Sequence, residues 1–140
     1  MNDPVTRRSS QLPRAFLVLA AAYFIASLGH FAHNAEFLCE YPSLPGWLTR
    51  AKVYASWGAI TSVGIAGFFM IAAARRAIGL ALVAAYAALG FDGLAHYAVA
   101  PMAWHTAGAN ATILGEVAAA ALLLVATLRL MALEFFVPTR

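Results

Sequence analysis

Residues 15–38 read AFLVLAAAYFIASLGHFAHNAEFL, an apolar run in which histidine, asparagine and glutamate appear only toward the end. An α-helix needs about 20 residues to cross a hydrocarbon core about 30 Å thick, because each residue adds about 1.5 Å. Three more apolar runs of comparable length follow, at 53–74, 77–100 and 111–133. The sequence therefore predicts an all-α, polytopic membrane protein whose four transmembrane helices form an up-down bundle.

The composition agrees with this class. Of the 140 residues, 63% are hydrophobic and only 11% are charged, which is unlike a soluble domain. We expect one four-helix transmembrane domain over residues 15–133, with short cytoplasmic tails at 1–14 and 134–140. The net charge of +3 is distributed among the helix ends, so the sequence predicts no nucleic-acid-binding face.

The basic residues predict the orientation, because the cytoplasmic flanks of spanning helices collect Lys and Arg. If both termini are cytoplasmic, only Arg50 and Lys52 lie on the outer side. The other seven of the nine basic residues then lie inside: Arg7, Arg8, Arg14, Arg75, Arg76, Arg129 and Arg140. The predicted location is the cell's inner (plasma) membrane, crossed four times.

A weak internal repeat relates the two halves of the chain. A shift of 63 residues places 17–35 over 80–98, and eight of the nineteen positions are then identical. Most matches are Ala or Leu, but Tyr23 with Tyr86 and His33 with His96 pair residue types that are scarce in spanning segments. Two helix pairs related by an axis along the membrane normal would make His33 and His96 symmetry mates.

The first helix carries an unusual group of polar side chains near its outer end. His30, His33, Asn34 and Glu36 fall within seven residues of an otherwise apolar run. Ionisable side chains inside a membrane span are costly and rare, so they indicate a functional site. At about 100° per residue, His33 lies in the middle of the polar arc that they form.

The third and fourth runs carry their polar side chains at the same outer end. Asp92 and His96 are four residues apart, which predicts that they stack on one helix face. His105 opens the fourth run, and Glu116 lies further along the same stripe. All four histidines are thus expected in one half of the bilayer, in a polar funnel that narrows toward mid-membrane.

The leading functional hypothesis is a transition-metal or haem site for redox or Lewis-acid chemistry. Histidine is the commonest transition-metal ligand, and His33 and His96, completed by His30 or His105, would bind zinc, copper or iron. The same two residues, His33 and His96, could instead be the axial ligands of haem b. Asp92 would orient His96 as a second-shell carboxylate does in metal sites.

A second hypothesis needs no metal. Asp92 would orient His96, Glu116 or Glu36 would donate a proton, and a neutral histidine would remove one. Such a site suits an isomerase, cyclase or hydrolase acting on a lipophilic small molecule that enters from the bilayer.

A third hypothesis is a structural or accessory membrane subunit. Its polar side chains would join helices through hydrogen bonds, each worth about 0.6 to 2 kcal/mol. A bundle of this size could also form a homodimer.

Overall fold

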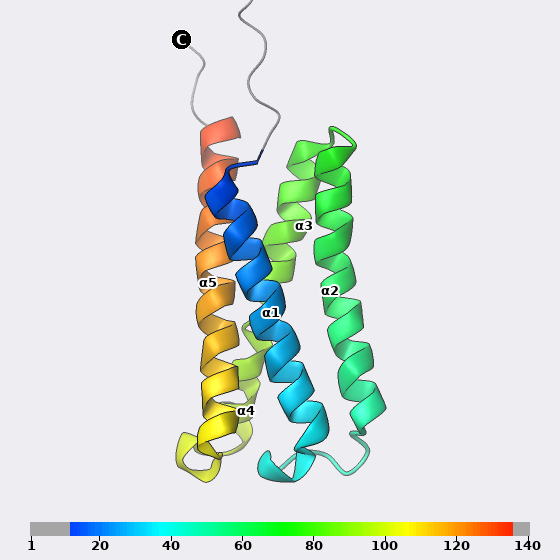
Figure 1. Ribbon diagram of the computed structural model, residues 1–140, viewed down its shortest axis with the longest axis vertical. Helices are drawn as coiled ribbons and strands as arrows, with labels where there is room; N and C mark the ends of the chain where they lie inside the picture. Colours follow the sequence, from blue (N-terminus) through cyan, green and yellow to red (C-terminus); the bar gives the residue numbers. More distant parts are fainter. Residues whose placement is uncertain (1–11, 136–140) are drawn as a thin grey trace, which may run out of the picture.

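The computed structural model describes residues 12–135, without the side chain of Phe135, and these form a four-helix bundle (Figure 1). Its long helices are α1 (Arg14–Glu36), α2 (Arg50–Ala72), α3 (Arg76–Leu89) and α5 (Ala107–Phe135). The short helix α4 (Ala95–Val99) continues the direction of α3, and the helices run alternately up and down. The predicted all-α up-down bundle is confirmed.

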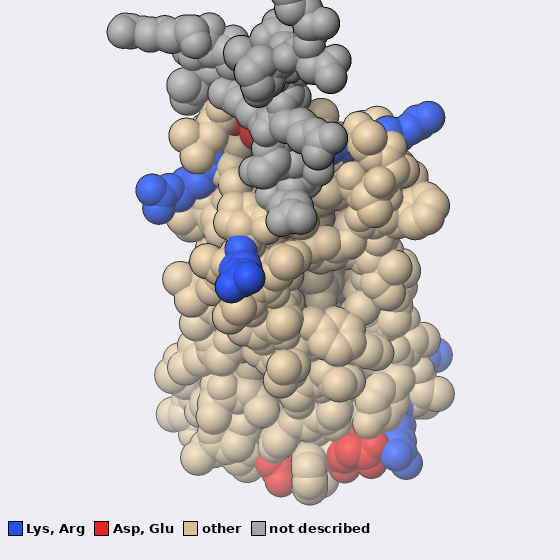
Figure 2. Space-filling model, turned by 45° about the horizontal axis from the view of Figure 1, so that its top comes forward, with Lys and Arg blue, Asp and Glu red and all other residues tan. Residues whose placement is uncertain are grey.

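Four segments are long and apolar enough to cross a membrane, with mean hydropathy between 1.6 and 2.1. They are Arg14–Glu36, Arg50–Ala72, Arg76–Val99 and Ala107–Glu134. Lys, Arg, Asp and Glu gather toward the two ends of the molecule, and the surface between them is mostly uncharged (Figure 2). The chain is therefore a multi-pass membrane protein.

Helices α2 and α3 approach closely because glycines face one another. A Cβ atom at Gly67 would lie 2.8 Å from Val83 Cγ2 and 3.0 Å from the carbonyl oxygen of Gly79. A Cβ atom at Gly64 would lie 2.6 Å from the Tyr86 ring. Van der Waals packing between small residues is a main source of helix association in a bilayer, so these contacts fix α3 on α2.

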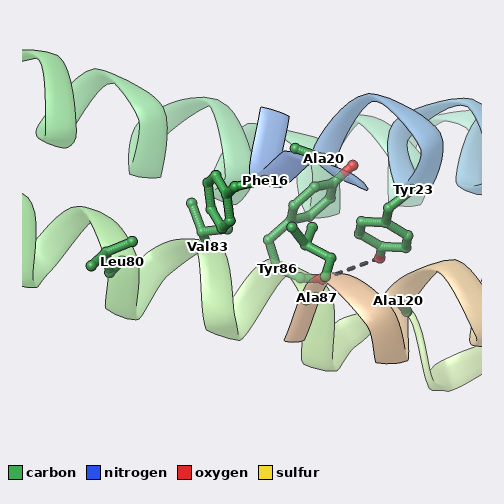
Figure 3. Packing of buried hydrophobic residues seen from close by; sticks show 9 residues of the cluster. Phe16, Ala20, Tyr23, Leu80, Val83, Tyr86, Ala87 and Ala120 are labelled. Carbon is green, nitrogen blue, oxygen red and sulfur yellow. Dashed lines mark hydrogen bonds between the residues drawn. The ribbon is translucent and has the colours of Figure 1, made fainter. Parts of the chain in front are cut away.

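Tyr23 and Tyr86 meet in the centre of the bundle (Figure 3). Their ring centroids are 4.6 Å apart, and the Tyr23 hydroxyl donates a hydrogen bond to the Tyr86 carbonyl oxygen at 3.1 Å. The predicted repeat relates these two positions, and α1 and α3 also run in the same direction, as that repeat expects.

The third span differs from the prediction, which took residues 77–100 as one regular helix. The α-helix ends at Leu89, and a 3₁₀ segment, η3 (Asp92–Leu94), precedes α4. Gly90, Asp92 and Gly93 are weak helix formers, which explains the change at this point. Helix α1 has no such break, so the two halves of the predicted repeat differ here.

The predicted tails fall almost entirely outside the described residues. Residues 1–11 and 136–140 belong to them, including Arg7, Arg8 and Arg140. Within the described part, residue 134 is still helical, and Glu134 forms an ion pair with Arg76 that joins α5 to α3.

The glycine contacts predict a matched pair of stability effects. Gly67→Ala forces α2 and α3 apart and should lower the free energy of unfolding by about 1–3 kcal/mol, as overpacking does. Gly58→Ala is the control, because a Cβ atom there meets no atom of the described residues within 4 Å. Thermal unfolding in detergent measures both, and equal stabilities would contradict the close α2–α3 packing.

Candidate functional site

The four histidines come together at one end of the bundle. His30 and His33 lie on the last turns of α1, His96 lies on α4, and His105 precedes α5. The ring centroids of His30 and His96 are 5.5 Å apart, and those of His96 and His105 are 6.1 Å apart. The expectation that imidazoles from distant parts of the chain share one end is confirmed.

Tyr41, from the connection between α1 and α2, lies at the centre of this histidine cluster. Its ring centroid is 4.9 Å from that of His96 and 5.7 Å from that of His33. It is 6.2 Å from His30 and 6.3 Å from His105. The side chain is only 3% exposed. Tyr41 therefore belongs to the site, although the sequence analysis did not select it.

The Tyr41 hydroxyl links α1 to α5. Its oxygen is 2.9 Å from His33 Nδ1 and 3.5 Å from Thr112 Oγ1. Burial raises the pKa of Tyr41, so the phenol keeps its proton at neutral pH. We assign that proton to the shorter contact, which makes His33 Nδ1 the acceptor and leaves the His33 proton on Nε2.

Glu40 lies at the edge of the histidine cluster. Its carboxylate accepts a hydrogen bond from Thr106 at 2.7 Å, and His33 Nε2 is 3.9 Å from the same oxygen. Thr106 also begins α5, because its side chain accepts a hydrogen bond from the Ala109 amide. Glu40 thus ties the α1–α2 connection to the start of α5.

Glu36, a predicted catalytic carboxylate, lies apart from the cluster. It forms an ion pair with Arg50 at 2.6 Å and accepts a hydrogen bond from Tyr54 at 2.8 Å. These contacts join the end of α1 to the start of α2 at the exposed edge of the bundle. Glu40, rather than Glu36, is the carboxylate beside His33.

His96 has a different partner from the predicted one. Its Nε2 atom is 3.3 Å from Asn34 Nδ2, so the amide donates to the imidazole. No hydrogen bond or ion pair between Asp92 and His96 is found in residues 12–135, and the Asp92 side chain is exposed in η3. The break in the third span removes the regular helical spacing on which the expected Asp92–His96 stack depended.

His105 is buried against the connection between α4 and α5, to which it belongs. Its Nδ1 atom donates to the Pro101 carbonyl oxygen at 3.2 Å, and its ring packs against Tyr97 with centroids 5.3 Å apart. The Tyr97 hydroxyl donates to Asn110 at 2.8 Å, which holds α4 to α5. Only 6% of His105 is exposed. This residue helps to close the end of the bundle.

Glu116 and His30 form the deepest part of the site. Glu116 is 0% exposed and His30 is 2% exposed. Glu116 Oε2 is 3.8 Å from His30 Nε2, and neither Glu116 oxygen has a hydrogen-bond partner of normal geometry in the described part of the chain. Gly93 borders the pair, since a Cβ atom there would lie 3.7 Å from Glu116 Oε2 and 3.8 Å from His30 Nε2.

The predicted metal site lacks a matching arrangement of ligands. Within residues 12–135, no three His, Cys, Asp or Glu side chains are placed so that they could hold one metal ion. Instead, the imidazoles of His30, His96 and His105 pack edge to face. For haem, Tyr41 contacts both His33 and His96, so the two predicted axial ligands do not face each other across an open space.

Comparison of the chain with protein families, with curated proteins and with solved structures finds no match. The functional argument therefore depends on the contacts of the site.

The central place of Tyr41 predicts a stability difference between two tyrosines. Tyr41→Phe removes the partner of the partly buried His33 Nδ1 and should cost about 1–2 kcal/mol. Tyr54→Phe is the control, because its hydroxyl bonds the exposed Glu36 and should cost less than about 0.5 kcal/mol. Thermal unfolding in detergent compares them, and an equal loss would contradict the assignment of Tyr41 to the cluster.

Proposed function

We propose that the protein is a membrane-embedded acid–base enzyme that moves a proton on a lipophilic molecule, with Glu116 and His30 as the exchanging pair. The observation that carries the proposal is the Glu116 carboxyl group, which is fully buried, has no hydrogen bond of normal geometry within residues 12–135 and lies 3.8 Å from an imidazole nitrogen. The fully buried Ser27 lies beside this carboxyl group. A buried carboxyl group with so few partners lowers stability, which favours a functional role over a structural one.

The two groups suit an isomerisation. Burial away from bulk solvent favours a neutral carboxylic acid beside a neutral imidazole. The His30 imidazole takes a proton from one atom of the substrate while Glu116 gives its proton to another atom. No oxidant or reductant is consumed. The resulting imidazolium then returns its proton to the carboxylate 3.8 Å away, which restores the neutral pair.

The remaining polar side chains hold this pair in place. Tyr41 binds His33, and Asn34 binds His96, so these groups already have partners within the protein. His96 packs against His30, with ring centroids 5.5 Å apart. We assign Tyr41, His33, Asn34 and His96 to positioning His30.

Hydrogen exchange with solvent tests the proposal without knowledge of the substrate. The purified protein is incubated in D₂O with a total lipid extract of its host membranes, and the lipids are analysed by mass spectrometry. The acidic protons of the Glu116–His30 pair should exchange with D₂O whenever the bound lipid leaves, so an acid–base enzyme should add deuterium to a particular lipid species. Glu116→Gln and His30→Phe should each slow this exchange at least about a hundredfold, which is the low end for removal of a general acid or base.

Two further variants complete the test. Gly93→Ala places a methyl group in ordinary contact with both side chains, and it should block exchange while the fold is kept. Glu36→Gln is the carboxylate control and should leave exchange unchanged. Full exchange in folded Glu116→Gln would overturn the proposal, and so would the absence of any deuterated species with the wild-type protein.

The metal or haem hypothesis is tested in the same preparation. Elemental analysis showing stoichiometric zinc, copper or iron, or a Soret band, would favour it over the acid–base mechanism. The imidazoles would then have to leave the packing around Tyr41, since they do not converge on one point in the described residues.

We further propose that both termini face the cytoplasm, on the basis of charge. Of the basic residues in 12–135, Arg14, Arg75, Arg76 and Arg129 lie at the end of the bundle where α1 begins, and Arg50 and Lys52 lie at the opposite end. The histidine cluster then lies on the outer side of the inner (plasma) membrane.

Cys39, the only cysteine, reports this orientation because it is exposed beside the histidine cluster. A membrane-impermeant maleimide should label it in intact cells. In a Cys39→Ser background, Ala73→Cys at the other end should be labelled only after lysis. The reverse pattern would place the cluster on the cytoplasmic side.

A further inference from the structure

A cavity opens on the lipid-facing side of the bundle among α1, α2 and α3. Its volume is about 210 Å³, and most of its lining residues are Ala, Gly, Phe and Ile. The exposed side chains of Ala21, Phe24 and Ile65 are part of its lining, so a molecule can reach it from the bilayer. This cavity is separate from the histidine cluster.

Two hydroxyl-bearing residues line this cavity near the middle of the membrane. Thr61 is 5% exposed and Tyr86 is 3% exposed, and neither hydroxyl has a hydrogen-bond partner of normal geometry among the described residues. Thr61 is residue 12 of the 23 in α2, so it lies about 17 Å from either end at about 1.5 Å per residue. Hydrocarbon offers no hydrogen-bonding group at that depth.

Thr61 differs from other helical hydroxyls of this protein. A threonine or serine inside a helix can donate to a carbonyl oxygen of the preceding turn. Thr127 does so to Leu123 at 2.7 Å, and Thr112 does so to Ala109 at 3.0 Å. Thr61 makes no such bond in the described structure, although nothing in its helical position prevents it. Its hydroxyl instead lies beside that of Tyr86 without a hydrogen bond of normal geometry, so both hydroxyls can turn to a group in the cavity.

We propose that the cavity binds a lipophilic molecule with one oxygen-bearing ring, whose oxygen is held by Thr61 and Tyr86. An apolar cavity of about 150 Å³ is large enough to bind benzene, so about 210 Å³ accepts one substituted six-membered ring. The proposal does not depend on Glu116 or His30, because Tyr23 packs against Tyr86 on the side toward the bundle centre.

The fluorescence of Trp57 can be used to measure binding to the cavity. Its ring centroid is 5.6 Å from that of Phe24, which lines the cavity. With Trp47→Phe and Trp104→Phe, Trp57 is the only tryptophan left. Quenching of its fluorescence is titrated with 4-bromophenol and with bromobenzene, which lacks the oxygen. We expect saturable quenching in which 4-bromophenol binds about 25-fold tighter, as two neutral hydrogen bonds of about 1 kcal/mol each provide.

Removal of either hydroxyl should reduce the preference for 4-bromophenol over bromobenzene. Tyr86→Phe and Thr61→Val should weaken 4-bromophenol binding about fivefold and leave bromobenzene binding unchanged. Each removes one hydroxyl of this adjacent pair and should lower the thermal stability less than Thr127→Val, which breaks a hydrogen bond of 2.7 Å. Thr127→Val is the control, and it should lower stability while the binding of both probes stays the same.

A substitution that fills the cavity with a larger side chain is the second part of the test. Ala21→Leu should prevent quenching by both probes, and Ala118→Leu on the exposed face of α5 should not. Equal affinity for the two probes would mean that the cavity holds lipid chains only and would overturn the proposal. Quenching unaffected by Ala21→Leu would also overturn it. Glu116→Gln should leave binding intact, so failure here is distinguishable from failure of the acid–base mechanism.

Discussion

Every polar side chain between the two ends of this bundle has to find its partner within the protein, because the hydrocarbon core offers none. Most of them do. Thr127 bonds its own helix, and Tyr23 bonds the Tyr86 backbone across the bundle. Against this background, the buried groups that lack a partner of normal geometry in the described structure stand out, and among them are two adjacent pairs: Glu116 with His30, and Thr61 with Tyr86. Both pairs are more easily explained by a bound molecule than by stability.

The break in the third span makes the histidine cluster possible. Gly90 leaves room for Tyr23, since a Cβ atom there would lie 2.5 Å from the Tyr23 hydroxyl oxygen. Gly93 lies beside Glu116 and His30, and the short helix α4 then carries His96 against His30. In a continuous helix, the His96 side chain would instead point in the direction set by the regular rotation per residue. The interruption loses some helical hydrogen bonds, but it brings His96 to the site that holds Glu116 and His30.

Hydropathy and helical periodicity were sufficient to predict the four spans and the end at which the histidines gather. They could not predict the individual partners. Periodicity gives the face on which Glu36 lies, yet the start of α2 brings Arg50 to it, and Glu40 in the following 3₁₀ segment η2 (Leu38–Glu40) is beside His33 instead. Tyr41 lies in an irregular connection, where no repeating pattern indicates the direction of a side chain.

The separation of 3.8 Å between His30 and Glu116 is itself informative. A shorter contact would be a strong hydrogen bond, and the pair would then be occupied with itself. A much longer one would prevent the proton from returning after each cycle. In the mechanism proposed above, this distance lets Glu116 and His30 each meet a ligand atom beside Gly93 and then return the proton from one to the other. The position of Glu116 deep in the bundle therefore fits chemistry on a molecule that water does not dissolve.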